Sequence, residues 1–496
     1  MNINEKKPDE RPQGRAGRDL THGSIPTHLI MFSLPMLLGS VLHTAYSFVN
    51  AIWVGQKLGT AAMAAVTISF PVVFVLTAVA MGLTMATSIL AAQAYGAKDW
   101  ARMRRVVQNS TVLVTVATII CLGLGQLYCR EILVAMNTPP DMLNMATDYM
   151  RIFLLTMPAT FGIFLTGALL RGIGDSKTPL YFQAVSVVLT AVLDPFLMFG
   201  WLGFPKLGLN GTAVATIISS SLAFISLAVY MQRKDSLVAP DWLHLRCDFK
   251  TSWLIMKIGV PSMIQQALVS ISMVVVIGIV NRFGEATAAA YGAASRIDQL
   301  AFMPALNFGA SVSTLAGQNI GAGKFDRVHQ VFRWGILISG AITIAASIIA
   351  VTMPAQLLRI FLSDPAVIAI GVPYLRIVGA GYVFFSVMFI SNGVINGAGH
   401  TFITTIFSLI SLWIVRVPLA TYLSGRMQKP EGIWYAMVIS FAVGMMVSVI
   451  YYLSGRWKHA LKGGPMADRG VFAGLDSGDP LPEGQVEFNK TPEVSE

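Results

Sequence analysis

One carboxylate lies deep in an otherwise apolar stretch of this chain. Asp194 is about sixteen residues into the stretch 178–200, a depth at which an ionisable side chain in a membrane is costly and usually functional. A buried carboxyl group can take up and release a proton or bind a cation, so Asp194 is the first candidate for an ion-coupling group. The alternative is a structural acid that pairs with an arginine or caps the backbone at a helix break.

A polar stripe follows the first apolar stretch, 29–53, and consists of His43, Tyr46, Ser47 and Asn50. This spacing places side chains on one face of a helix, and in a membrane such a face turns toward protein or water. Asn50 lies at a depth similar to that of Asp194, but an amide cannot carry a proton. We expect Asn50 to join Asp194 in ion coupling, with Tyr46 and His43 lining the same cavity. His43 could instead be a packed hydrogen-bond donor.

Further polar side chains predict the remainder of this cavity. Thr190 lies one helical turn before Asp194, although a threonine hydroxyl in a helix more often bonds its own backbone. In the second half of the chain, the stretch 254–281 is polar on part of its circumference through Gln265, Gln266 and Ser270.

Three charged residues of the second half also fall within apolar stretches: Arg296, Asp298 and Arg416. Arg296 and Asp298 are two positions apart, so they point to different faces of a helix and should not pair with each other. Arg416 holds in the second half roughly the place that Asp194 holds in the first. We expect both arginines to pair with protein groups or cap backbone rather than to contact a substrate.

The elements that position these residues are predicted to be membrane helices. Hydrophobic residues make up 54% of the 496 residues, charged residues 12%, and the mean hydropathy is +0.64. A soluble domain carries about 25% charged residues, and roughly 20 apolar residues cross a bilayer as a helix. We predict an all-α polytopic membrane protein with twelve transmembrane helices, at about 29–53, 60–86, 106–128, 146–170, 178–200, 209–231, 254–281, 287–312, 331–353, 370–394, 402–424 and 432–454.

The two halves of this apolar region repeat the same residues about 225 positions apart. The clearest pairs are Gln93 with Gln318, Gly96 with Gly321, Tyr149 with Tyr374 and Gly172 with Gly397. Six helices per half return the chain to the same side, so the halves should form two six-helix lobes related by a pseudo-twofold axis along the membrane normal. We predict an N-lobe at 29–231, a cytoplasmic linker at 232–252 and a C-lobe at 253–455, with a cleft for substrate between the lobes.

The formal net charge of +10 is distributed as in a membrane protein, not as in a nucleic-acid-binding protein. Basic residues crowd the predicted inner loops, which places both termini in the cytoplasm. The segment 1–28 is polar and lacks the apolar core of a cleavable signal peptide. We expect 1–28 and 456–496 to be disordered cytoplasmic tails.

Several short motifs together resemble the multidrug and toxic compound extrusion (MATE) family. They are Leu170-Arg171-Gly172-x-Gly174-Asp175-x-Lys177-x-Pro179, Leu193-Asp194-Pro195, Gly317-Gln318-Asn319-x-Gly321-Ala322 and Val415-Arg416-Val417-Pro418. The resemblance covers about 29–455 and looks closest to the DinF-like bacterial branch. It implies export of amphipathic cations in exchange for protons or sodium ions, by two lobes that alternate between outward- and inward-facing forms. It also implies ion coupling by Asp194, whereas many relatives carry an aspartate where this chain has Asn50.

The sequence offers no constellation for catalysis or for a resident cofactor. The segment 317–325 is superficially similar to a phosphate loop, but Phe325 stands where Ser or Thr should coordinate magnesium. No His and Cys residues have the spacing of a metal site, and the cysteines Cys121, Cys129 and Cys247 form no disulfide framework. We expect no enzyme activity and no cofactor beyond the coupling ion. A proton is favoured over sodium because one carboxylate suffices for a proton.

Two other functions fit parts of this pattern. A flippase or exporter of lipid-linked oligosaccharides would need a larger, basic cavity for pyrophosphate, to which Arg296 and Arg416 could contribute. A membrane-embedded enzyme or receptor would have to carry the twofold repeat without a catalytic constellation. We expect instead an exporter of small amphipathic cations, monomeric in the lipid bilayer.

Overall fold

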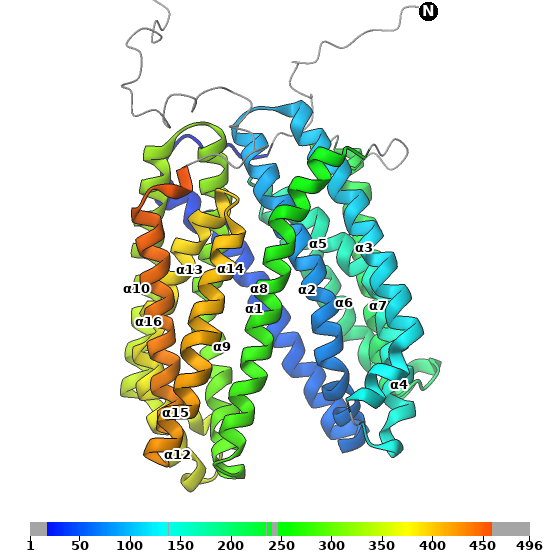
Figure 1. Ribbon diagram of the computed structural model, residues 1–496. Coiled ribbons are helices and arrows are strands. Elements are labelled where there is room, and N and C mark those ends of the chain that lie inside the picture. The colour runs from blue at the N-terminus through cyan, green and yellow to red at the C-terminus, as the bar shows by residue number, and fades with distance from the viewer. Residues whose placement is uncertain (1–16, 137, 235, 241–246, 459–496) are drawn as a thin grey trace, which may run out of the picture.

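The computed structural model describes residues 17–136, 138–234, 236–240 and 247–458, in which helices are the only regular secondary structure (Figure 1). The first half contains α1 (Ile25–Trp53), α2 (Thr60–Gly96), α3 (Trp100–Ala135), α4 (Pro140–Leu154), α5 (Met157–Gly172), α6 (Lys177–Phe199) and α7 (Leu209–Arg233). The second half contains α8 (Phe249–Asn281), α9 (Glu285–Gly321), α10 (Phe325–Thr352), α11 (Pro354–Arg359), α12 (Pro365–Ala380), α13 (Tyr382–Gly397), α14 (Thr401–Ser408), α15 (Val417–Met427) and α16 (Glu431–Leu453). Two segments are π-helical: η1 (Val54–Leu58) follows α1, and η3 (Leu409–Arg416) joins α14 to α15.

Ten helical segments are each long and apolar enough to cross a membrane, with Thr401–Met427 forming one of them. Two further spans are bent pairs, α4 with α5 at 43° and α12 with α13 at 42°. The first bend falls just before Pro158, whose missing backbone N–H removes a helical hydrogen bond. Counting each bent pair as one span, the described residues contain the twelve transmembrane helices that the sequence predicts.

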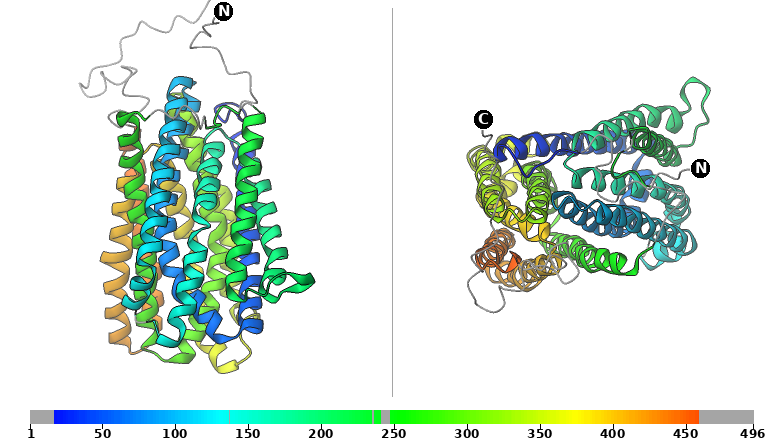
Figure 2. Two further views of the ribbon diagram at one scale, coloured as in Figure 1. Left: turned by 90° about the vertical axis from the view of Figure 1, so that its right-hand side faces the viewer. Right: turned by 90° about the horizontal axis from the view of Figure 1, so that it is seen from above.

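The two halves repeat the same helices with matching bounds. α2 and α9 are both 37 residues long, and α5 and α13 are both 16 residues long, each pair beginning at equivalent positions of the sequence repeat. The halves stand side by side as two lobes (Figure 2). One apolar cluster lies around Leu90, Leu133 and Leu169 of the N-lobe and includes the start of α8, and another lies around Tyr374, Tyr382 and Trp434 of the C-lobe. The predicted all-α, two-lobe fold is confirmed.

The segment 17–24, here called the strap, is packed against the helices, whereas the sequence predicted that it is part of a disordered tail. Leu20 is only 1% exposed, and it packs with Phe32 of α1 and with Leu315 of α9 in a third apolar cluster. The strap lies across one end of the bundle, here called the strap end, and α1 begins directly after it. Residues 1–16 lie outside the described part of the chain.

The second predicted tail also begins with packed residues. Trp457 is fully buried, stacks on Tyr452 with ring centroids 5.6 Å apart, and donates its indole N–H to the carbonyl of Tyr452 at 2.9 Å. These contacts keep 456–458 against α16 at the strap end, whereas 459–496 lie outside the described residues.

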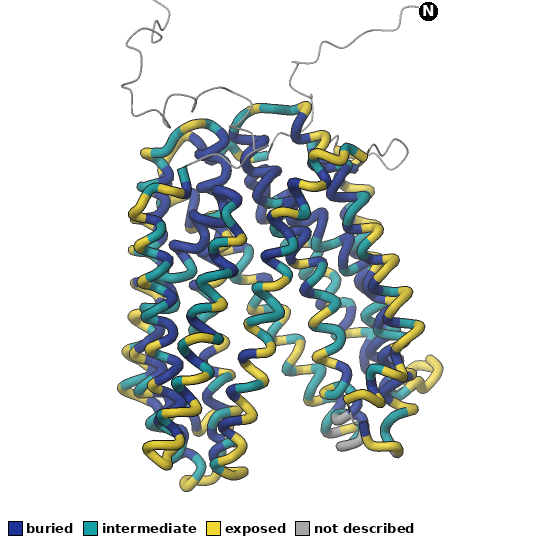
Figure 3. Tube along the Cα trace, in the orientation of Figure 1, coloured by how far each residue is buried: buried dark blue, intermediate teal, exposed yellow. Residues whose placement is uncertain are grey.

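α1 contacts both lobes, although the prediction placed it within the N-lobe. Its first half packs on α9 and α10 of the C-lobe through the cluster that contains Leu29 and Phe32, and its second half packs on α6. Buried positions are concentrated where the lobes meet near the strap end, and exposed positions line the outer surface (Figure 3). α1 therefore connects the strap end to the region of the predicted ion-coupling residues.

The linker between the lobes is anchored at the start of α8. Asp248 caps this helix by accepting hydrogen bonds from the backbone N–H groups of Lys250 and Thr251. Asn109 of α3 accepts hydrogen bonds from the Asp248 N–H at 2.7 Å and from the Ser252 hydroxyl at 2.8 Å. The N-lobe therefore holds the first turn of the C-lobe's first helix, while 241–246 lie outside the described residues.

Candidate functional site

Asp194 belongs to α6, faces the second half of α1 and is 1% exposed. Its Oδ2 atom accepts hydrogen bonds from the Tyr46 hydroxyl at 3.1 Å and from the Asn50 amide Nδ2 at 3.0 Å. The sequence spacing places Tyr46 and Asn50 one helical turn apart, and both side chains reach the same carboxylate. The hydrogen bonds found for Asp194 come from these neutral donors and not from an arginine, so the arginine-paired alternative does not describe this site.

The second carboxylate oxygen, Asp194 Oδ1, is buried and has no hydrogen-bond partner among the described residues. A buried carboxylate oxygen without a donor is unfavourable, and the cost is removed when the oxygen binds a proton or a cation. Pro195 follows directly within α6 and supplies no backbone N–H at this point. The arrangement is chemically suited to reversible uptake of one positive charge.

Other residues predicted for this cavity lie apart from Asp194 or bond elsewhere. His43 is exposed, and the hydroxyl of Thr190 donates to the backbone carbonyl of Ser186 at 2.8 Å. On α8, Gln265 donates to the Ser408 hydroxyl at 2.9 Å, and Ser270 donates to the carbonyl of Gln266 at 3.0 Å. Gln266 itself lies against Met81 of α2. Among the described residues, Tyr46 and Asn50 therefore bond to Asp194, and the hydrogen bonds of Thr190, Gln265, Gln266 and Ser270 go to other partners.

Asp298 of α9 is the buried acid of the C-lobe and is 5% exposed. It accepts a hydrogen bond from the Tyr382 hydroxyl at 2.5 Å, and its other oxygen accepts one from the Tyr374 hydroxyl. Both carboxylate oxygens are therefore satisfied, in contrast to Asp194. Sequence reasoning did not identify these tyrosines as partners, although the Tyr149–Tyr374 pair of the repeat marked one of them.

The two intramembrane arginines differ in their surroundings. Arg416 is 8% exposed, donates through Nε to the Ser440 hydroxyl at 2.9 Å and lies 4.9 Å from the centre of the Phe441 ring. Arg296 is exposed and lies 5.3 Å from the centre of the Phe48 ring of α1. The structure agrees with the expectation that Arg296 and Asp298 do not pair.

The repeated glutamines of α2 and α9 join the two lobes near the strap end. Gln93 donates to the carbonyl of Gly397 at 2.8 Å, and Gln318 donates to the carbonyl of Gly172 at 2.9 Å. Both donors and both acceptors are pairs of the sequence repeat, so the two bonds are symmetric equivalents. The repeated glycines allow this contact, because a Cβ on Gly96 would lie 1.9 Å from the Gln318 carbonyl oxygen and one on Gly321 would lie 2.1 Å from that of Gln93. We call these two glutamines and two glycines the gate quartet.

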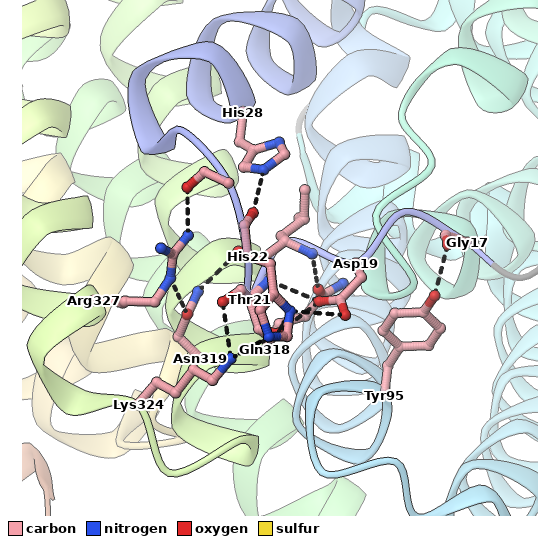
Figure 4. Close-up of polar contacts among 12 residues, drawn as sticks. Gly17, Asp19, Thr21, His22, His28, Tyr95, Gln318, Asn319, Lys324 and Arg327 are labelled. Carbon is pink, nitrogen blue, oxygen red and sulfur yellow. Dashed lines mark hydrogen bonds and ion pairs between the residues drawn. The ribbon is translucent and has the colours of Figure 1, made fainter. Parts of the chain in front are cut away.

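Beside the gate quartet, the strap forms further hydrogen bonds with both lobes (Figure 4). From the N-lobe, the Tyr95 hydroxyl donates to the Gly17 carbonyl at 2.6 Å. From the C-lobe, Gln318 Oε1 accepts a hydrogen bond from the Leu20 N–H at 3.0 Å. Three C-lobe side chains donate to strap carbonyls: Asn319 to that of Leu20, Lys324 to that of Thr21 and Arg327 to that of Gly23. The strap end is thus closed by contacts that involve both lobes and the chain's N-terminal segment.

Asp19 stabilises the conformation of the strap through hydrogen bonds to other strap residues. Partial burial acts to raise the pKa of its carboxyl group, but hydrogen bonds from the Thr21 hydroxyl and N–H and from His22 outweigh burial and hold the pKa below its usual value. The charged carboxylate therefore stabilises the turn that presents the strap carbonyls to the C-lobe.

Comparisons with known proteins agree with this geometry. The MatE family model matches residues 35–196 and 261–422, one match in each lobe. The "Probable multidrug resistance protein YoeA" of Bacillus subtilis is 35% identical over 434 residues, 86% of this chain and 94% of that protein. The "Probable multidrug resistance protein YpnP" of the same organism is 31% identical over 441 residues, 89% of this chain and 97% of that protein.

Solved structures share the fold. The crystal structure of a MATE protein in complex with MaD5 superimposes with a TM-score of 0.82 at 22% identity, covering 90% of this chain and 98% of that one. A MOP superfamily transporter from Pyrococcus furiosus superimposes with the same TM-score at 23% identity.

The fold, the duplicated match and the similar proteins define a multi-pass membrane transporter. The chain belongs to the MATE family, as the motifs in its sequence indicated.

Proposed function

We propose that this protein is a secondary active exporter that moves small amphipathic cations out of the cell in exchange for protons or sodium ions. The observation that carries the proposal is the buried Asp194 carboxylate with one unpartnered oxygen. The names of the relatives, probable multidrug resistance proteins, support export of varied compounds. A duplicated transporter with parallel lobes supports alternating access.

The coupling ion we propose is the proton. Asp194 receives neutral donors from Tyr46 and Asn50 on one oxygen, which leaves the other oxygen available for a proton. One carboxylate suffices to carry a proton, whereas sodium usually takes several oxygen ligands. Protonation of Asp194 from the outside would favour release of the cation, and loss of the proton would restore affinity.

The strap end is proposed to face the cytoplasm of a bacterial cell, with the protein in the inner membrane. Lys98, Arg104, Lys177, Lys234 and Lys250 all lie at or beside helix ends on this side. An excess of basic residues in short loops marks the cytoplasmic side. In this orientation the gate quartet and the strap close the cytoplasmic side, and Asp194 lies in the outer half of the membrane.

The test is transport by purified protein in liposomes with the variant Asp194→Asn. The matched control is Asp298→Asn, which changes the satisfied buried carboxylate of the other lobe. With folding verified for both, we expect Asp194→Asn to abolish uptake driven by a pH gradient and Asp298→Asn to retain it. Undiminished coupled transport by Asp194→Asn would remove Asp194 from the mechanism, and transport driven only by a sodium gradient would overturn the choice of ion.

The flippase alternative is less well supported by the C-lobe contacts. A pyrophosphate would need basic side chains that face a cavity. Arg416 is buried and bonded to Ser440, so of the two intramembrane arginines that were candidates for this role, Arg296 is the one still available to bind a pyrophosphate. Deletion of the gene separates the two functions. Loss of drug tolerance without an envelope defect supports the exporter, and an envelope defect with normal drug tolerance supports the flippase.

A further inference from the structure

A cavity at the strap end lies apart from Asp194 and from the gate quartet. Its volume is about 350 Å³, and its walls come from the strap, the first turns of α1, the loop before α6 and the last turns of α7. The charged residues in its lining are Arg18, Asp175, Lys177 and Lys234. The cavity therefore collects three basic side chains and one acid from three separate segments of the chain.

The acid does not neutralise the basic side chains. Asp175 caps α6: its carboxylate accepts from the N–H groups of Lys177 and Thr178, each at 3.0 Å, and from the Thr178 hydroxyl at 2.6 Å. In the part of the chain that the structure describes, Arg18, Lys177 and Lys234 form no ion pair. The cavity keeps an excess of positive charge, which is suited to an anion.

A buried histidine supplies a further free polar group. His28 lines the cavity and is 8% exposed. Its Nε2 lies 2.7 Å from the carbonyl oxygen of His22, so this nitrogen carries a hydrogen, whereas Nδ1 is buried with no partner among the described residues. His28 therefore adds a nitrogen without a described partner to the wall of the cavity.

The lining also has an apolar part, which continues onto the outer surface of the helices. Met31 and Tyr230 are part of the lining and are themselves exposed. Beyond them, exposed apolar side chains follow the same helices away from the strap end, such as Leu34 and Leu38 on α1, Tyr181 and Val185 on α6, and Ile225 and Val229 on α7. The basic cavity therefore stands at the end of a lipid-facing apolar surface, the position of a phospholipid headgroup.

We propose that this cavity binds the phosphate group of an anionic phospholipid, with the acyl chains lying along α1, α6 and α7. Arg18, Lys177 and Lys234 neutralise the phosphate. Basic pockets between membrane helices bind anionic headgroups through this combination of charge and adjacent hydrocarbon. Because Arg18 belongs to the strap, the lipid would contact the closed strap end directly.

Thermal unfolding of the full-length protein in detergent tests this site. A ligand that binds the folded state alone raises the unfolding temperature in a saturable manner. The probes are a short-chain phosphatidylglycerol, a phosphatidylcholine with the same chains, and inorganic phosphate. We expect a saturable rise with phosphatidylglycerol only. An equal rise with phosphatidylcholine, or the absence of any rise, would overturn the proposal, and an equal rise with inorganic phosphate would overturn the choice of a lipid.

Two charge-matched triple variants locate the effect. Arg18→Gln/Lys177→Gln/Lys234→Gln removes the basic lining, and Arg104→Gln/Lys250→Gln/Lys257→Gln removes the same charge from exposed positions of α3 and α8 outside the cavity. We expect half-saturation to need at least about tenfold more phosphatidylglycerol in the first variant and to be unchanged in the second. Equal responses of the two variants would overturn the site. If the first variant does not fold, the single exposed change Lys234→Gln gives a smaller loss of the same sign.

Discussion

Asp194 and Asp298 are buried acids of opposite character. Asp194 has one oxygen without a donor, whereas both oxygens of Asp298 accept from tyrosine hydroxyls. A fully bonded buried carboxylate rigidifies its surroundings, and a half-bonded one is poised to bind a further ligand. The difference supports a structural role for the acid of the C-lobe and the proposed ion-coupling role for the acid of the N-lobe.

The variant Tyr374→Phe tests the structural role of Asp298. Loss of the hydroxyl leaves one carboxylate oxygen without its donor, and a buried hydrogen bond to a charged group contributes about 1.5–3 kcal/mol. We expect the free energy of unfolding to fall by roughly this amount. Thermal unfolding in detergent measures it, with Tyr128→Phe at an exposed position of α3 as the control. A change no larger than that of the control would contradict the role.

At the same scale, part of the site was accessible from sequence. The helical spacing of Tyr46 and Asn50 placed them on one face, because spacing along one helix fixes which side chains share a face. The similar depth of Asn50 and Asp194 indicated a pair on the condition that their helices are neighbours, and the structure meets that condition. The partners of Asp298 were not predictable in this way. Tyr374 and Tyr382 reach it from two other helices, and the order in which helices pack is not encoded in the local pattern of any one of them.

Among the helices, α2 and α9 show the sequence repeat most clearly, because their repeated glutamines and glycines form the contact between the lobes. Local composition predicted both helices but not that Gln93 and Gln318 would bond across the lobes, since this requires the lobes to be placed first. The strap was predicted wrongly for a related reason. Its polar composition is typical of a tail, and the partners that order it lie about 300 residues further along the chain.

The variant Gly96→Ala tests the gate quartet. The added Cβ would lie 1.9 Å from the Gln318 carbonyl oxygen, which is backbone and cannot move aside without separating α2 from α9. The control is Gly123→Ala on α3, where a Cβ meets nothing within 4 Å. Spin labels at Arg104→Cys and Arg333→Cys, without Cys247, report the separation. We expect a longer distance and loss of transport in Gly96→Ala, and an unchanged distance would show that the quartet does not hold the lobes together.

The start of α8 gives a prediction about pH. Hydrogen bonds from the Thr251 hydroxyl and from backbone N–H groups hold the pKa of Asp248 below its usual value of 3.8. A group with a lowered pKa stabilises the folded state above its unfolded pKa, and the effect is lost as the pH falls through the folded pKa. We expect Asp248→Ala to lower stability by about 1 kcal/mol at pH 7. The difference from the unmodified protein should shrink below pH 3.8, and a difference that grows there would contradict the capping role.

For the whole molecule, the orientation in the membrane can be read from the native cysteines. Cys247 is exposed beside the start of α8 at the strap end, whereas Cys121 and Cys129 are buried. A membrane-impermeant maleimide should therefore label the protein in everted vesicles and not in right-side-out vesicles or intact cells. Cys247→Ser is the control and should remain unlabelled in both. Labelling from the outside would reverse the proposed orientation.

The strap has a consequence for the order in which the chain matures. It leaves the ribosome first, but Gln318, Lys324 and Arg327, to which it binds, are made about 300 residues later. Contacts between such distant segments form late, because the intervening chain must be in place before they can close. Docking of the strap is thus among the last events of biogenesis, and in a chain arrested in its second half the N-lobe would lie in the membrane without the contacts that close the strap end.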